Sequence, residues 1–182
     1  VGVLRMPNNP AFAPGDEFTT DLFRDFALCR LFITNGWDLL AAAGAPRWSI
    51  RSARLGCQTA LLNGNRLASW IALTAQFRDI GKEQGKRWLE IPYEALLTLG
   101  DAEAAVRELW EILTGESYAP LLTLLRLAEA RYVSGTIGDP FALAPLVKVV
   151  FAERPQLRRR QGLGNRDLHE VIRELVLAWL RG

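Results

Sequence analysis

The residues of this chain that could do chemistry are mostly arginines and lysines, and they fall into three groups along the sequence. The groups are Arg47, Arg51 and Arg54, then Arg78, Lys82, Lys86 and Arg87, and finally Arg154, Arg158, Arg159 and Arg160. Guanidinium groups suit bidentate phosphate contacts, and such contacts hold a nucleic-acid backbone without reading its sequence. These residues are therefore predicted to bind nucleic acid. The open alternative is that they meet an acidic protein surface.

Charge is distributed in blocks, although the net charge is only +2. Residues 46–88 carry 8 basic and 2 acidic side chains, and residues 146–182 carry 8 and 4. Residues 89–145 carry 3 basic and 9 acidic side chains, and residues 1–45 carry 3 and 5. Such blocks predict separate positive and negative faces, which bear on partners rather than on the fold. A positive face could also meet the negative face of a second copy.

The inventory for catalysis is poor. The single histidine, His169, has no cysteine or second histidine at the spacing of metal ligands. Glu108, Glu111 and Glu116 could do acid–base work, but nothing in the sequence places two of them in one cleft. There is no phosphate-binding loop and no Gly-x-Ser-x-Gly motif. We predict no enzyme activity, no metal and no cofactor.

Composition indicates an ordinary globular chain. Hydrophobic residues make up 49% and charged residues 23% of 182 positions, which predicts one domain with a sizeable core. No run approaches the roughly 18 uncharged apolar residues of a membrane span. The first residues lack the apolar core of a signal peptide, and the two cysteines cannot build a disulfide framework. We expect a cytoplasmic protein.

The hydrophobic pattern predicts an all-α fold. Residues 1–15, with three prolines, are expected to form an extended arm, and residues 16–182 a single helical domain of about seven to eight helices. Helical patterns cover 16–35, 37–43, 49–62, 66–77, 92–99, 101–113, 120–133, 141–153 and 165 onward, and those at 37–43 and 92–99 are short. The segment 120–133 is apolar on most sides and is predicted to be the central helix, since such a helix needs neighbours all round.

Two local predictions depend on finer patterns. Phe18, Leu22, Phe26, Cys29 and Ile33 repeat at helical spacing and are predicted to form the buried stripe of the first long helix. Gly81 and Gly85 interrupt the pattern after residue 77, so a small hairpin or loop is predicted near 78–91, with a frayed helix as the alternative.

At the level of architecture, the chain resembles the helical small subunits of class 1 CRISPR effector ribonucleoproteins. The resemblance rests on size, helix content, the poor catalytic inventory and the arginine groups around Arg51, Arg87 and Arg159. It implies a non-catalytic subunit of an antiviral-defence complex that binds RNA or DNA through basic faces, beside other subunits or further copies of itself. The alternative is a helical protein–protein interaction or oligomerisation module with no nucleic-acid role.

Overall fold

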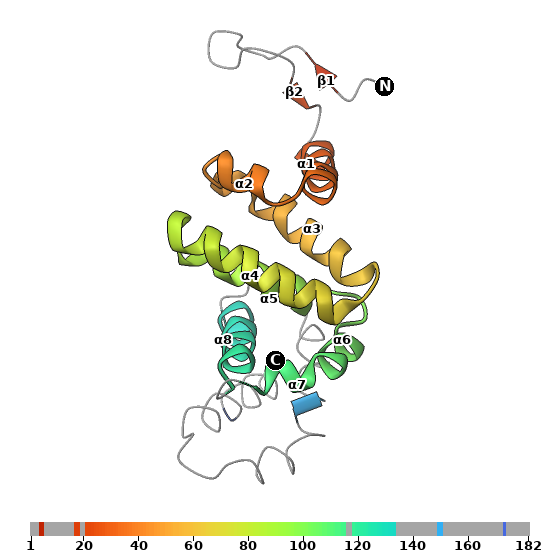
Figure 1. Cartoon of the computed structure of the whole chain (residues 1–182), viewed down its shortest axis with the longest axis vertical. Helices are drawn as coiled ribbons and strands as arrows, with labels where there is room; N and C mark the ends of the chain where they lie inside the picture. Colours follow the sequence, from red (N-terminus) through yellow and green to blue (C-terminus); the bar gives the residue numbers. More distant parts are fainter. Residues whose placement is uncertain are drawn as a thin grey trace.

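The computed structural model describes residues 4–5, 17–18, 21–115, 118–133, 149–150 and 173. This part of the chain is helical, apart from one pair of two-residue strands (Figure 1). The elements are β1 (Leu4–Arg5), β2 (Glu17–Phe18), α1 (Asp21–Asn35), α2 (Asp38–Ala42), the 3₁₀ helix η1 (Arg47–Ser49), α3 (Ile50–Leu62), α4 (Arg66–Gln84), the 3₁₀ helix η2 (Lys86–Glu90), α5 (Ile91–Leu97), α6 (Ala102–Glu108), α7 (Trp110–Leu113) and α8 (Ala119–Val133). The prediction of an all-α fold is confirmed.

Among the described elements, α5 lies in the middle. It contacts α3, α4, η2, α6 and α8, and all of its residues except Tyr93 are buried. Figure 1 shows α1 and α2 above α3, with α4 and α5 across the middle and α7 and α8 below them. The segment 120–133 is a helix as predicted, and Leu121, Leu124 and Leu125 are fully buried in it. Among the described elements, α8 has its main contacts with α5 and α7, while α5 contacts more of the other elements.

A row of four aromatic rings packs α1, α4 and η2 against one another. The rings of Phe32 and Trp37 lie 5.5 Å apart between centroids, those of Trp37 and Phe77 4.8 Å, and those of Phe77 and Trp88 6.5 Å. Trp37 packs directly over Gly56 of α3, where a Cβ atom would lie 2.7 Å from the indole Cη2. Close packing at this point therefore requires glycine.

The first long helix differs from its prediction in both start and orientation. It begins at Asp21 rather than residue 16, because the backbone of Glu17–Phe18 pairs with Leu4–Arg5 in an antiparallel ladder. The buried residues of α1 are Asp25, Cys29 and Phe32. Leu22 and Phe26, predicted to be buried, are 60% and 63% exposed, and Ile33 is also exposed. The side of α1 that faces α3 carries Asp25 and Cys29, which contact Ser52 and Thr59 of α3. This side is next to the predicted stripe rather than the same as it.

The predicted hairpin near 78–91 is wrong. Helix α4 continues to Gln84, and η2 follows after a single residue. Gly81 is a helical residue that lets Leu89 approach, since a Cβ there would lie 2.6 Å from the leucine Cγ. Gly85 ends the helix with φ +108°, a conformation that favours glycine. The two glycines thus serve a close contact and a helix end, not two strands.

Other boundaries are close to prediction. The segment 101–113 is divided into α6 and α7 at Leu109, while its predicted inner face, Val106, Leu109, Trp110 and Leu113, is buried. Val149 and Val150 are helical and buried, within the helix predicted over 141–153. The rest of that helix, most of the N-terminal arm and nearly all of the helix predicted from 165 lie outside the described residues. Within the described part, no helix is both long and apolar enough to cross a membrane.

Candidate nucleic-acid interface

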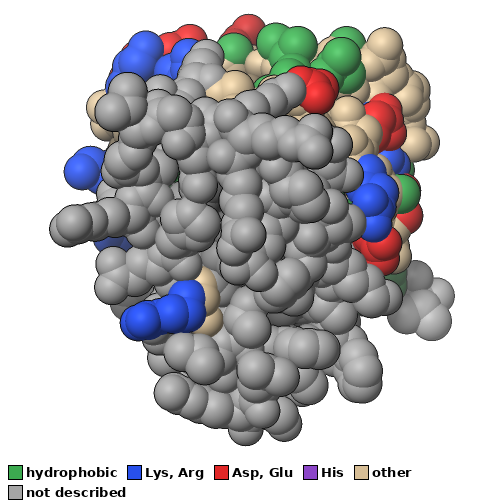
Figure 2. All heavy atoms as spheres, turned by 90° about the horizontal axis from the view of Figure 1, so that it is seen from below, with side chains coloured by type: hydrophobic (Ala, Val, Ile, Leu, Met, Phe, Trp, Pro, Cys, Tyr) green, Lys and Arg blue, Asp and Glu red, His purple; other side chains and the backbone are tan. Residues whose placement is uncertain are grey.

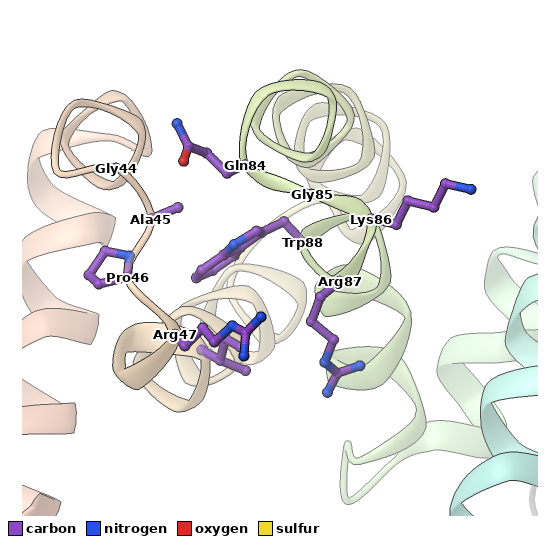
Figure 3. Close-up of a pocket in the computed structure, with 10 residues that line it drawn as sticks. Gly44, Ala45, Pro46, Arg47, Gln84, Gly85, Lys86, Arg87 and Trp88 are labelled. Atoms are coloured by element: carbon purple, nitrogen blue, oxygen red, sulfur yellow. The ribbon is translucent and has the colours of Figure 1, made fainter.

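A cavity of about 750 Å³ lies where the turn before η1 faces the junction of α4 and η2 (Figure 3). Its volume falls in the range of small-molecule sites. Three of the ten described lining residues are cationic and none is acidic; the ten are Gly44, Ala45, Pro46, Arg47, Ile50, Gln84, Gly85, Lys86, Arg87 and Trp88. The cavity lining therefore includes Arg47 from the first group together with Lys86 and Arg87 from the second, which are more than thirty residues away from it in sequence.

Tight turns form the two walls of the cavity. Gly44 and Ala45 both have positive φ, 70° and 41°, and the Ala45 N–H donates to the Leu40 carbonyl across the end of α2. Positive φ is uncommon for alanine, and the burial of Ala45 helps to hold it there. On the opposite wall Gly85 reverses the chain between α4 and η2. The backbone thus fixes the places from which Arg47 and Arg87 extend.

Side-chain directions differ among the three cations. Figure 3 shows Trp88 between Gln84 above and Arg47 below, with Arg87 also on the lower side, whereas Lys86 extends away from the indole. Arg47, Lys86 and Arg87 are all exposed. The Nη1 atom of Arg87 contacts Glu90 at 2.6 Å and also contacts Glu94. Burial lowers the pKa of Arg87, but the bonds to these two glutamates outweigh it, so the pKa lies above its ordinary value.

Arg51 pairs with Asp25; the arginine side chain is 59% exposed, whereas that of the aspartate is 1% exposed. The Arg51 Nε lies 3.3 Å from Asp25 Oδ2, and the Arg24 Nη2 lies 3.6 Å from Oδ1. Ser52 donates its hydroxyl to the same Oδ1 at 2.9 Å. A buried carboxylate needs such compensation, so Arg51 stabilises the contact between α1 and α3.

Arg54 turns to the other side of α3. Its Nη1 lies 3.8 Å from Oε2 of Glu94, a buried residue of α5 that also binds Arg87. Gln58, one turn further on, donates to the carbonyl and hydroxyl of Thr98 at 3.1 and 2.7 Å. The row predicted from Arg51 and Arg54 therefore divides, one arginine facing α1 and the other α5.

The remaining predicted cations separate into paired, open and undescribed residues. Lys82 lies 2.9 Å from Asp79, and this hydrogen bond lowers the pKa of Asp79. No carboxylate of the described part lies within ion-pair distance of Arg47, Arg78 or Lys86. In the view of Figure 2, basic side chains lie in several separate places, some of them beside acidic ones. Arg154, Arg158, Arg159 and Arg160 lie outside the described residues, as does His169.

The other side chains that could bind a metal or react do not form a site in the described part. No group of three or more His, Cys, Asp or Glu side chains there could hold a metal ion. Cys29 and Cys57 are free thiols. Burial raises the pKa of Cys57 well above its ordinary value, with a smaller contribution from Cys29, so its thiol stays neutral.

Two exposed features were missed by reasoning from the sequence. Trp48 is 55% exposed, and the guanidinium carbon of Arg24 lies 5.7 Å from its ring centroid. Helix α1 also presents large exposed hydrophobic residues, which are Leu22, Phe23, Phe26, Leu31 and Ile33. The signal available in the sequence was an apolar content in 22–33 larger than one buried stripe requires.

No family model matches the chain, and neither a curated protein nor a solved structure matches it significantly.

Proposed function

We propose that this chain is a non-catalytic helical subunit of a larger nucleoprotein assembly, similar in kind to the small subunits of class 1 CRISPR effectors. It contacts the phosphate backbone through the rim of the cavity between η1 and η2. The observation that carries the proposal is the meeting of Arg47, Lys86 and Arg87 around a cavity whose described lining contains no carboxylate.

The open cations are better suited to phosphate than the paired ones. Arg47 and Lys86 have no described carboxylate to release before they bind an anion. Arg87 is paired with Glu90 and Glu94, and its contribution to phosphate binding would come from the five N–H donors that a guanidinium carries in total. Each phosphate neutralised by a cation releases condensed counterions, which is the main source of sequence-independent affinity.

Nucleic acid that copurifies with the chain is the first test. Absorbance at 260 and 280 nm, before and after nuclease treatment, shows whether it is bound. Fluorescence anisotropy with labelled RNA and DNA homopolymers then gives affinities between about 50 and 200 mM salt. We expect binding that weakens steeply with salt and is alike for different sequences. Absent binding at low salt, or binding insensitive to salt, contradicts the proposal.

A second candidate, a protein–protein interaction module, is favoured by the outer side of α1. Leu22 and Phe26 are each more than half exposed on adjacent turns of that helix. Contiguous apolar surface of this kind often marks a binding site on soluble proteins. Light scattering across a range of concentrations tests self-association, with Leu22→Ser/Phe26→Ser as the disrupting variant. If self-association is the function, the parent oligomerises and the variant does not.

A further inference from the structure

Trp48 differs from the other tryptophans that the structure describes. Trp37, Trp70, Trp88 and Trp110 are between 1% and 8% exposed, whereas Trp48 is 55% exposed on η1. A large aromatic ring held in water contributes little to the core, and its exposed part can contact a planar group from outside the fold.

One arginine lies over this indole, and a second follows it in the sequence. Arg24 lies over the ring, and its guanidinium is fixed by Asp21 at 3.0 Å and by Asp25 at 3.6 Å. Arg51 follows Trp48 by three residues, which places it on the same side of the helix, and it is anchored to Asp25. The ring is therefore packed against one cation, Arg24, that is itself held in place by carboxylates.

The preceding residue links this ring to the cavity. Arg47 and Ile50, three residues apart, line the cavity, while Trp48 and Arg51 lie toward α1. A phosphate at Arg47 and a ring at Trp48 would thus be offered by consecutive residues of one short helix. A nucleic-acid strand could place its backbone on the first and a base on the second.

We propose that Trp48 is a stacking platform for an unpaired base, so the chain prefers single-stranded nucleic acid over duplex. This inference rests on the proposed function. Duplex bases are already stacked on their neighbours, whereas a single strand can turn a base out onto an aromatic side chain. Stacking of this kind tolerates any base, in agreement with backbone contacts that do not read sequence.

The test compares the parent with Trp48→Leu and Trp48→Phe on three labelled ligands of equal length: a single strand, a duplex and an abasic single strand. The leucine variant should bind the single strand about 5- to 100-fold more weakly, the usual effect of removing one stacking ring. Its affinity for the duplex and for the abasic strand should match that of the parent. Phenylalanine should restore most of the loss, since it retains an aromatic face.

The outcomes separate this inference from the proposed function. A parent that binds none of the three ligands overturns both. A parent that binds the single strand, with a leucine variant that binds it equally well, overturns stacking and leaves the backbone interface standing. An equal loss on the abasic strand also overturns stacking, because that ligand has the charge but no base. Urea unfolding of each variant checks that the fold is retained.

Discussion

Two regions of this molecule carry arginines that look alike in sequence but serve different ends. In the contact between α1, α3 and α5, Arg51 and Arg54 face the buried carboxylates of Asp25 and Glu94. At the rim of the cavity, Arg47 and Lys86 extend to solvent without a described carboxylate in ion-pair range. The first region uses its cations for stability. In the second region Arg47 and Lys86 are open for a ligand, whereas Arg87 is also paired with Glu90 and with the buried Glu94.

Whether a cation stabilises the fold or can bind a ligand depends on the carboxylate beside it. Arg47 and Arg51 are four residues apart, yet only Arg51 lies beside a carboxylate that burial makes costly to leave alone. Removing cations from the first region should therefore change unfolding, and removing them from the second should change binding.

The largest effect is expected from Arg24→Ala/Arg51→Ala, which leaves Asp25 buried with only the Ser52 hydroxyl. We expect a loss of about 3 kcal/mol in the free energy of unfolding, at the lower end for a broken buried pair because both arginines are partly exposed. Urea denaturation measures it. Adding Asp25→Ala should recover much of the loss. A loss below about 1 kcal/mol, typical of surface pairs, would place these arginines with the open ones.

Cys57, on the same helix α3, is a buried titratable group without an opposite charge. Its raised pKa means that the folded state holds the proton more tightly than the unfolded state does. Stability is therefore complete below the ordinary pKa of 9.0 and is lost as pH rises above it. The loss approaches about 1.4 kcal/mol per pH unit relative to Cys57→Ala, measured by urea denaturation at several pH values. Parallel curves for parent and variant would contradict this account of the core.

Arg158, Arg159 and Arg160 lie outside the described residues and are predicted from the sequence to bind phosphate. If Arg158, Arg159 and Arg160 each meet a phosphate, replacing all three by alanine should flatten the log–log salt slope of single-strand binding by about two units. Every sequence should be weakened alike, and anisotropy at several salt concentrations gives the slope. An unchanged slope in a folded variant would show that this loop never touches the backbone.

The sequence predicted the helices well where one apolar face is buried. Ala53, Cys57 and Leu61 repeat at helical spacing within the predicted helix 49–62 and are buried, and so are Val106, Leu109, Trp110 and Leu113 within 101–113. The predicted buried side of α1 was wrong. Phe26 is more hydrophobic than Asp25, yet Asp25 is the buried residue because α3 supplies its hydrogen-bond partner, Ser52. Periodicity carries no information about such partners.

The candidate site was predictable only in part. Arg47, Lys86 and Arg87 were named from their type, but their meeting around one cavity depends on how the turn at Ala45 and the end of α4 at Gly85 are placed. The pairing of Arg54 with Glu94 was also out of reach, since it joins residues forty positions apart across a helix interface. Long-range geometry decides which cations are open.

The most direct test of the division between open and paired cations is the salt dependence of single-strand binding in two charge-matched variants. Arg47→Ala/Lys86→Ala removes two open cations, and Lys82→Ala/Arg107→Ala removes two that form exposed pairs with Asp79 and Glu103. The first should flatten the log–log slope by about 1.4 units, from 0.7 per phosphate contact, and the second should leave it nearly unchanged. Equal slopes in the two variants would contradict the account, because only overall charge would then matter.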